Sequence, residues 1–297
     1  MDVKRKRHKT HAQMKKEQAQ RGVLQVRLLA QLDELFAYKC WEIERTEISC
    51  YMRYVRTLSK LRPEEQNLMF DLSRRFVHIQ IGDYAKALAK PLGQLRAQYA
   101  GKLIFIGCVS EEDIKNHEVK SCKNVLYQLK GTTMKYFIEI GRKRVCDNVR
   151  YVRGTEIDEV NAGNAMLVFV DDFIGTGETA MDAAKYLAKA QPKLTNWKNV
   201  CFLAIAAQKE GVKNLKDVGY KVFVSEEYGR GISDYYKGEQ LEEARGTMSH
   251  IESGLKRVEK DFKFGYQQSE ALVCMERCPN NTFPIYWLTK HDAPYER

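Results

Sequence analysis

Residues 166–179 read MLVFVDDFIGTGET. An apolar run ends in two adjacent carboxylates, Asp171 and Asp172, and a Gly/Thr loop follows before an Ala-rich helical segment. Such a loop gathers backbone N–H groups and hydroxyls at a helix N-terminus, where the dipole favours an anion. The two acids need hydroxyl donors or a cation as partners. A sugar phosphate meets both demands, although a buried strand followed by an ordinary capped turn would also give part of this pattern.

This segment resembles the 5-phosphoribosyl-1-pyrophosphate (PRPP) motif of type I phosphoribosyltransferases. The resemblance implies that the loop binds the 5′-phosphate and that the acids hold the ribose 2′ and 3′ hydroxyls. It assigns catalytic and ribose-binding roles to Asp171 and Asp172, and the phosphate loop comprises Gly175, Thr176, Gly177, Glu178 and Thr179. Gly175 departs from the threonine that this family usually carries before its Thr-Gly pair.

The composition is that of a globular protein without membrane-spanning segments. Hydrophobic residues make up 44% of the 297 positions, and no apolar run approaches the ~18–20 residues that a membrane span needs. The chain opens with charged residues, so a secretory signal is not expected. The eight cysteines are scattered, which is typical of reduced thiols. We therefore expect a cytoplasmic protein with no membrane partner.

Most of the positive charge lies in the first residues of the chain. Residues 1–27 hold nine Lys/Arg and two acids, which accounts for +7 of the net charge of +10. We treat residues 1–21 as a basic arm that could bind DNA or RNA phosphates, and a solvated arm is the alternative. The candidate contacts are Lys4, Arg5, Lys6, Arg7 and Lys9.

Three regions follow the arm. Residues 22–100 show helical periodicity, with a helix starting at Pro63 and Pro91 expected between two helices. Residues 101–232 alternate strand-like and helical runs, which predicts an α/β fold with a parallel sheet. Residues 233–297 are expected to cap and complete this phosphoribosyltransferase-like core. The strong strand candidates are 103–106, 166–170, 200–206 and 220–224, and the weaker ones are 134–140 and 149–152.

The pyrophosphate side of the predicted site is less clear in the sequence. PRPP chemistry at ribose C1 calls for Mg²⁺ or cationic donors, because negative charge develops on the leaving pyrophosphate. The loop after the 103–106 strand is acidic, which suits pyrophosphate poorly. The candidates that could compensate are Ser110, Lys115, Ser121 and Lys123, with the segment 141–144 as a cationic loop. We expect Mg²⁺ to bind through the substrate near Asp171 and Asp172, without a direct protein site.

Other polar groups at the predicted sheet edge have two interpretations. Arg153 could lie near the site or make a surface salt bridge. The residues after the last strand could contact an acceptor or nucleobase, or could simply be polar loop residues; they are Glu226, Glu227, Tyr228 and Arg230.

The C-terminal region carries a second, narrower resemblance. Residues 279–287 read PNNTFPIYW, after an FGY at 264–266 and an ALVC at 271–274. This pattern is similar to the phosphoribosyltransferase-like (PRTase-CE type) effector domains of bacterial conflict and anti-phage systems, retron effectors among them. The Asn280–Asn281 turn, fixed by Pro279 and Pro284, either holds the C-terminus on the core or contacts a base or a partner.

Three functional hypotheses follow. The leading one is a defence effector that acts on a PRPP-like or nucleotide-like ligand at ribose C1 with Mg²⁺. The second is a non-catalytic sensor that binds a nucleotide or PRPP, which the acidic loop at 110–113 favours. The third is a nucleic-acid-associated toxin component that works with a partner protein such as a reverse transcriptase. The second resemblance implies the defence setting; residue spacing alone does not.

Overall fold

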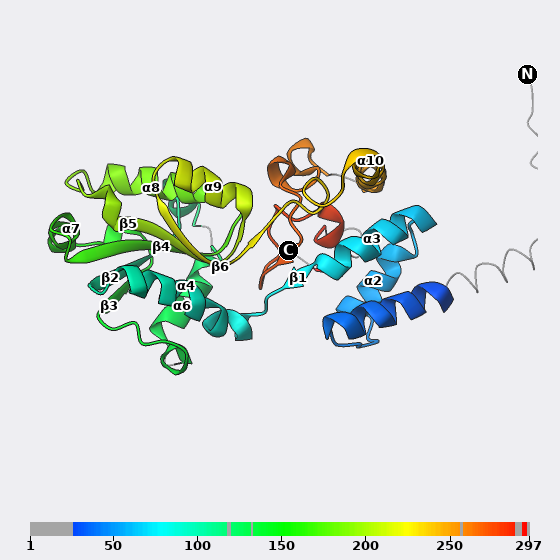
Figure 1. The fold of residues 1–297 in the computed structure, drawn as a ribbon, viewed down its shortest axis with the longest axis horizontal. Coiled ribbons are helices and arrows are strands. Elements are labelled where there is room, and N and C mark those ends of the chain that lie inside the picture. The colour runs from blue at the N-terminus through cyan, green and yellow to red at the C-terminus, as the bar shows by residue number, and fades with distance from the viewer. Residues whose placement is uncertain (1–25, 118–119, 132, 256–257, 289–292, 296–297) are drawn as a thin grey trace, which may run out of the picture.

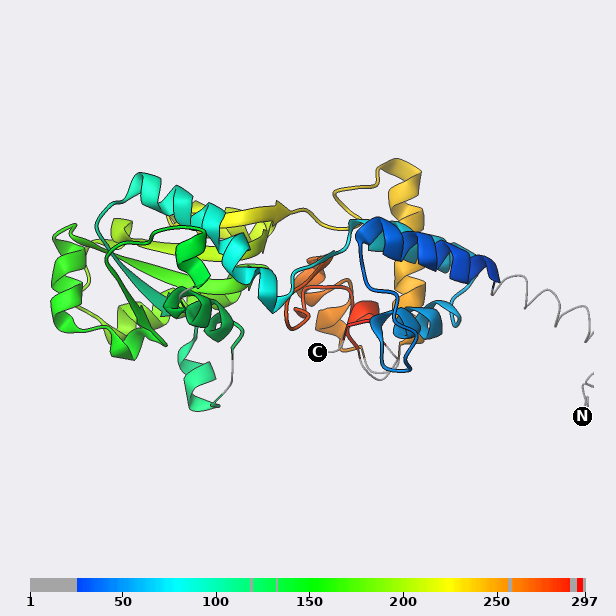
Figure 2. The ribbon, with the colours of Figure 1, turned by 90° about the horizontal axis from the view of Figure 1, so that it is seen from below.

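The computed structural model describes residues 26–117, 120–131, 133–255, 258–288 and 293–295. The basic arm, with its candidate nucleic-acid contacts Lys4–Lys9, lies outside the described residues. Two lobes lie end to end along the longest axis, an α/β lobe and a mainly helical lobe, and two stretches of chain run between them (Figures 1 and 2). In the described part of the chain, no helix is both long and apolar enough to cross a membrane. All eight cysteines are free thiols, as predicted.

The α/β lobe is built on a five-stranded parallel sheet with the order β3-β2-β4-β5-β6. The strands are β2 (Lys102–Gly107), β3 (Lys143–Cys146), β4 (Ala165–Ile174), β5 (Val200–Gln208) and β6 (Lys221–Tyr228). Strands β2, β4 and β5 are buried along nearly their whole length, because helices cover both faces of the sheet. The four strong strand predictions and the parallel α/β fold class are confirmed.

Each face of the sheet has its own helical layer. Helices α7 (Gly154–Asn161), α8 (Glu178–Ala190) and α9 (Lys209–Asp217) pack on one face, over Leu167 and Phe169. Helices α4 (Tyr84–Gln98) and α6 (Cys122–Lys130) pack on the other, over Phe105 and Val168. Figure 1 shows α8 and α9 on the opposite side of the sheet from α4 and α6. This alternation of side chains follows from the two-residue repeat of a strand.

The helical lobe combines helices from the first part of the described chain with its C-terminal segment. It contains a helix over 26–39, α2 (Cys50–Leu58), α3 (Pro63–Arg75) and α10 (Gly238–Gly254), which share one apolar core with the C-terminal segment. Phe76 stacks on Tyr295 and also contacts Tyr286, with ring centroids 4.9 and 4.4 Å apart. Between the lobes, the short strands β1 (Val77–His78) and β7 (Val273–Cys274) pair in parallel. These contacts hold the C-terminal segment beside the carboxyl ends of the large sheet.

Several local predictions are wrong. Helix α4 continues through Pro91 instead of breaking there, at the cost of one backbone hydrogen bond. The weaker strand candidates are 3₁₀ helices, at Thr133–Tyr136 and Val149–Tyr151. The second half of the expected cationic loop at 141–144 belongs to β3, whose Arg144 pairs with the buried Glu156 of α7. Because β3 is an edge strand with half-exposed side chains, it lacks the apolar run that marks a buried strand.

A buried carboxylate on α10 makes stability depend on pH. Both oxygens of Glu252 accept from the Phe264 N–H at 3.0 Å, and burial raises its pKa to about 7. A glutamate in the unfolded chain has a pKa of about 4.3, so this ionisation destabilises the fold increasingly as pH rises from about 4 to about 7. We expect Glu252→Gln to raise the free energy of unfolding by about 1–3 kcal/mol at pH 8, measured by urea denaturation.

At pH 4 the same substitution should change that free energy much less, because the wild-type carboxyl is then largely protonated in both states. Glu243→Gln, an exposed position on the same helix, is the matched control and should be neutral at both pH values. An equal effect of Glu252→Gln at pH 4 and pH 8 would contradict this assignment.

Candidate functional site

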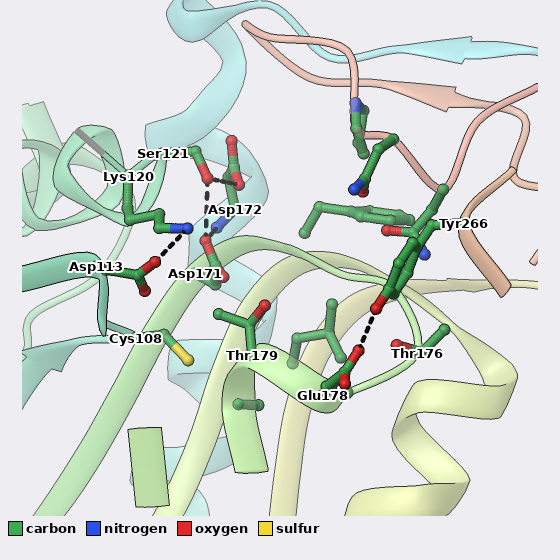
Figure 3. A pocket seen from close by; sticks show the side chains of 18 of the residues that line it. Cys108, Asp113, Lys120, Ser121, Asp171, Asp172, Thr176, Glu178, Thr179 and Tyr266 are labelled. Atoms are coloured by element: carbon green, nitrogen blue, oxygen red, sulfur yellow. Dashed lines mark hydrogen bonds and ion pairs between the residues drawn. The ribbon is translucent and has the colours of Figure 1, made fainter. Parts of the chain in front are cut away.

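A cavity of about 940 Å³ opens at the carboxyl ends of β2 and β4. It is lined by the predicted acid pair and phosphate loop, by Ser110, Ser121 and Lys123, and by the C-terminal residues Tyr266 and 277–281. The segments come from both halves of the chain, so the cavity exists only once the C-terminal segment has packed. Figure 3 shows the acid pair and Ser121 on one side and Tyr266 on the other.

The phosphate loop connects β4 to α8. Strand β4 runs on to Ile174, so both acids belong to the strand itself and the loop begins at Gly175. Gly177 has φ +87°, a left-handed conformation that glycine adopts without strain, and it is the N-cap of α8. The amide of Asn214 on α9 donates to the Thr176 carbonyl at 3.0 Å and holds the loop from behind. The loop therefore presents a helix N-terminus to the cavity.

The two acids are held differently. Tyr84 donates to Asp172 Oδ2 at 2.9 Å, and Ser121 Oγ lies 2.6 Å from Asp172 Oδ1, so both oxygens of this carboxylate are engaged. Asp172 is only 3% exposed. Asp171 is half-buried and lies 3.1 Å from the same Ser121 hydroxyl. Asp171 is therefore the acid with room for a ligand, and Asp172 is part of the supporting network.

The acid pair is electrostatically unfavourable when both members are ionised. Burial raises the pKa of Asp171 well above its ordinary value, and the charge of Asp172 raises it further. Burial also raises the pKa of Asp172, although its hydrogen bonds to Ser121 and Tyr84 oppose the shift. A ligand hydroxyl or a cation at Asp171 would offset this cost.

The donor set fits a Mg²⁺ ion only in part. Within the described ranges, no cluster of three or more acidic, cysteine or histidine side chains could enclose a metal. Mg²⁺ commonly binds through one or two carboxylates and takes its other ligands from substrate oxygens and water. Asp171, with its half-buried carboxylate facing the cavity, suits that arrangement.

The loop that follows β2 should repel phosphate less strongly than its number of acidic residues implies. Ser110 caps the short helix α5 (Glu111–Lys115), and Glu111 pairs with Lys189 at 2.6 Å. Asp113 lies 2.6 Å from the Lys120 ammonium. Burial alone would raise the pKa of Asp113, but Lys120 and the Ser110 amide lower it below its ordinary value. Much of the acidic charge on this loop is thus neutralised within the protein.

The C-terminal turn packs directly against the phosphate loop. A Cβ placed on Gly175 would lie 2.2 Å from Asn281 Oδ1, so the Asn281 side chain fills the space that a threonine would need. Asn281 is 8% exposed and donates to Ser269 Oγ at 3.1 Å. The indole N–H of Trp287 donates to the Thr282 carbonyl and fixes the end of the turn. The turn is therefore both a structural clamp and a wall of the cavity.

Not every predicted residue lies at the cavity. Lys115 pairs with Glu111 and does not line it, and Arg153 caps α7 through its backbone. Glu226 pairs with Lys90, while Glu227 lies 3.9 Å from Lys216. Tyr228 and Arg230 line a separate hollow of about 280 Å³ beside α9.

Sequence reasoning did not single out several residues of the site. Tyr84 lies 88 positions before Asp172 and has no local signal. Tyr266 belongs to the FGY run at 264–266, which pointed to the family but not to a role. Cys108 and Arg277 also line the cavity.

Comparison with known proteins identifies the family. The PRTase-CE family model matches residues 54–296. This match spans most of the chain, so the protein belongs to the PRTase-CE family. A search of curated proteins gave no match.

Proposed function

We propose that this member of the PRTase-CE family binds a 5-phosphoribosyl or nucleotide ligand in the cavity and acts at ribose C1 with Mg²⁺. The observation that carries the proposal is the shared cavity, in which the phosphate loop at 175–179 and the Asp171 carboxylate face one space. Its volume is within the range of about 300–1,000 Å³ that is typical of small-molecule sites.

In this proposal each group of site residues has a separate role. The loop amides at the start of α8 bind the 5′-phosphate, and Asp171 accepts from a ribose hydroxyl. Asp171 Oδ1 accepts from the Asp172 N–H at 2.9 Å and lies 3.1 Å from the Ser121 hydroxyl. Tyr84 and Ser121 in turn hold the Asp172 side chain, at 2.9 and 2.6 Å. Such preorganised groups cost little reorganisation when charge develops at C1. Mg²⁺, when bound, would supply positive charge beside the leaving group.

The charge of the lining supports a ligand that arrives with a cation. Six carboxylates line the cavity, and they face only three cationic side chains. The acids are Glu112, Asp113, Asp171, Asp172, Glu178 and Asp182, and the cations are Lys120, Lys123 and Arg277. A bare polyphosphate would be repelled by this excess, whereas its Mg²⁺ complex carries less negative charge.

The biological setting we propose is an anti-phage defence system, in which the protein is a toxic effector. The resemblance of the C-terminal region to conflict-system domains supports this setting. We also propose that the basic arm contacts DNA or RNA, and that the protein works with a partner such as a reverse transcriptase. The positive charge of the arm is what supports the nucleic-acid contact.

The test is mass spectrometry of nucleotide pools after induced expression. We expect wild type to deplete or modify one nucleotide-like metabolite. The variant Asp171→Asn/Asp172→Asn should lose this effect and its toxicity while remaining folded, because it keeps the shape of the site without the carboxylates. Unchanged depletion in that variant would refute the proposal.

A non-catalytic sensor is the second candidate. It is favoured by the excess of carboxylates in the lining, and by the engagement of Lys120 with Asp113 on the pyrophosphate side. Calorimetry separates the two functions: a sensor binds PRPP or a nucleotide without turnover, whereas an enzyme also forms product from the bound ligand.

A further inference from the structure

We infer that Tyr266 is a positioning residue that fixes the Glu178 carboxylate against the C-terminal segment and so limits its repulsion of an anion bound at the phosphate loop. The inference rests on the proposed function, because it concerns the same loop. It adds a role for the C-terminal segment: the segment controls the affinity of the loop for phosphate through the orientation of one acidic side chain.

Glu178 is badly placed for a phosphate site. It is the first residue of α8, so its backbone belongs to the loop at the helix N-terminus. A carboxylate beside a bound phosphate would repel it, because both groups are negatively charged. The Glu178 side chain must therefore be restrained for the loop to bind an anion well.

Two neutral donors of the C-terminal segment bind this carboxylate. The Tyr266 hydroxyl donates to Glu178 Oε2 at 2.8 Å, and the Gln267 amide donates to the same oxygen at 3.2 Å. Figure 3 shows Tyr266 reaching Glu178 from the side opposite Asp171 and Asp172. Because these donors carry no charge, they fix the carboxylate without adding a cation that would compete with the ligand.

The turn that carries Tyr266 is held in an unusual conformation. Phe264, Gln267, Gln268 and Glu270 all have φ between +50° and +58°, which non-glycine residues rarely adopt. Such a backbone persists only where its surroundings hold it, and it is frequent at functional sites.

Buried hydrogen bonds anchor this turn at both ends. At one end, the Phe264 N–H donates to Glu252 of α10 at 3.0 Å. At the other, the fully buried Glu270 accepts from the Ile232 and Ser233 N–H groups and from Arg245 of α10, at 2.7–2.9 Å. Contacts with the helical lobe thus fix the position from which Tyr266 donates to Glu178.

The hydroxyl is also a stable donor. Its hydrogen bond to Glu178, together with partial burial, raises the pKa of Tyr266 above its ordinary value. Tyr266 therefore keeps its proton through the neutral range, and the contact does not depend on pH there.

The test is calorimetric titration with ribose 5-phosphate, and with inorganic phosphate as a second probe. We expect Tyr266→Phe to lower the affinity for both on the order of tenfold, because the released carboxylate then samples positions beside the anion. The loss should shrink at high salt, which screens repulsion between exposed charges. In a Glu178→Gln background, which keeps the loop amide but has no carboxylate to release, Tyr266→Phe should cause no further loss of affinity.

The matched control is Tyr151→Phe, an exposed tyrosine outside the cavity lining, which should bind like wild type. The inference is overturned if Tyr266→Phe binds normally, or if it loses the same affinity in the Glu178→Gln background, since Tyr266 would then touch the ligand itself. Failure of wild type to bind either probe would overturn the proposed function and this inference with it. Thermal unfolding of each variant confirms that the fold is intact.

Discussion

Asp171→Asn is expected to lower the affinity for ribose 5-phosphate at least a hundredfold while making the protein more stable at neutral pH. The affinity falls because a carboxylate that accepts from a ribose hydroxyl is replaced by a weaker, uncharged acceptor. The stability rises, by about 1 kcal/mol or more, because the substitution removes a carboxyl whose ionisation is opposed by burial and by the charge of Asp172. Calorimetry and thermal unfolding measure the two effects on the same samples.

The raised pKa of Asp171 also predicts how the stability gain of Asp171→Asn changes with pH. The folded-state pKa of Asp171 is raised above the value of about 3.9 for an unfolded aspartate, so its ionisation destabilises the fold increasingly as pH rises. The stability difference between Asp171→Asn and wild type should therefore be small near pH 3 and grow toward neutral pH.

Asp217→Asn is the matched control. Asp217 is exposed, pairs with Lys213 on α9 and lies outside the cavity lining, so its substitution should leave both affinity and stability nearly unchanged. An Asp171→Asn protein that binds ribose 5-phosphate as tightly as wild type would remove this residue from the site.

Gly175→Thr, which introduces the residue that type I phosphoribosyltransferases usually carry, is expected to damage this protein. The new Cβ would lie 2.2–2.5 Å from three atoms of the Asn281 side chain. Overpacking of this kind typically costs about 1–3 kcal/mol of stability. Displacement of the loop or of the turn should also abolish ligand binding, which calorimetry and thermal unfolding would both register.

The same clash predicts a rescue. Asn281→Gly removes the side chain that the threonine meets, so the double variant should recover most of the stability that Gly175→Thr alone loses. Gly154→Ala is the control for added bulk, because its Cβ would meet no atom within 4 Å. If Asn281→Gly fails to improve Gly175→Thr, the contact between the turn and the loop is not the cause.

The parallel core could be predicted because strands buried on both faces are continuously apolar in sequence. Runs such as 103–106 and 200–206 are continuously apolar since helices cover them above and below. Strand β3 escaped prediction because it lies at the edge of the sheet, where Lys143 and Arg144 reach solvent or partners. The break expected at Pro91 does not occur because helix α4 packs on the sheet. The free energy of this packing exceeds the cost of one lost backbone hydrogen bond.

The site could be predicted where its residues form one local motif or follow a predicted strand, as Ser110, Ser121 and Lys123 do. The acid pair and the phosphate loop form one local segment, so a single motif indicates both. The contributions of Tyr84, Tyr266 and Asn281 depend on how distant segments pack, and no local pattern encodes that. The packing also explains why Gly175 differs from the usual threonine, since Asn281 occupies the space. Likewise, the unequal environments of Asp171 and Asp172 follow from tertiary contacts that two adjacent aspartates cannot reveal.

The central claim is that the phosphate loop and Asp171 form one ligand site. A crystal structure of the protein with PRPP and Mg²⁺ tests it most directly. The account predicts the 5′-phosphate on the amides of residues 176–179 and a ribose hydroxyl within hydrogen-bonding distance of Asp171. A ligand bound elsewhere, with this loop and Asp171 untouched, would contradict it.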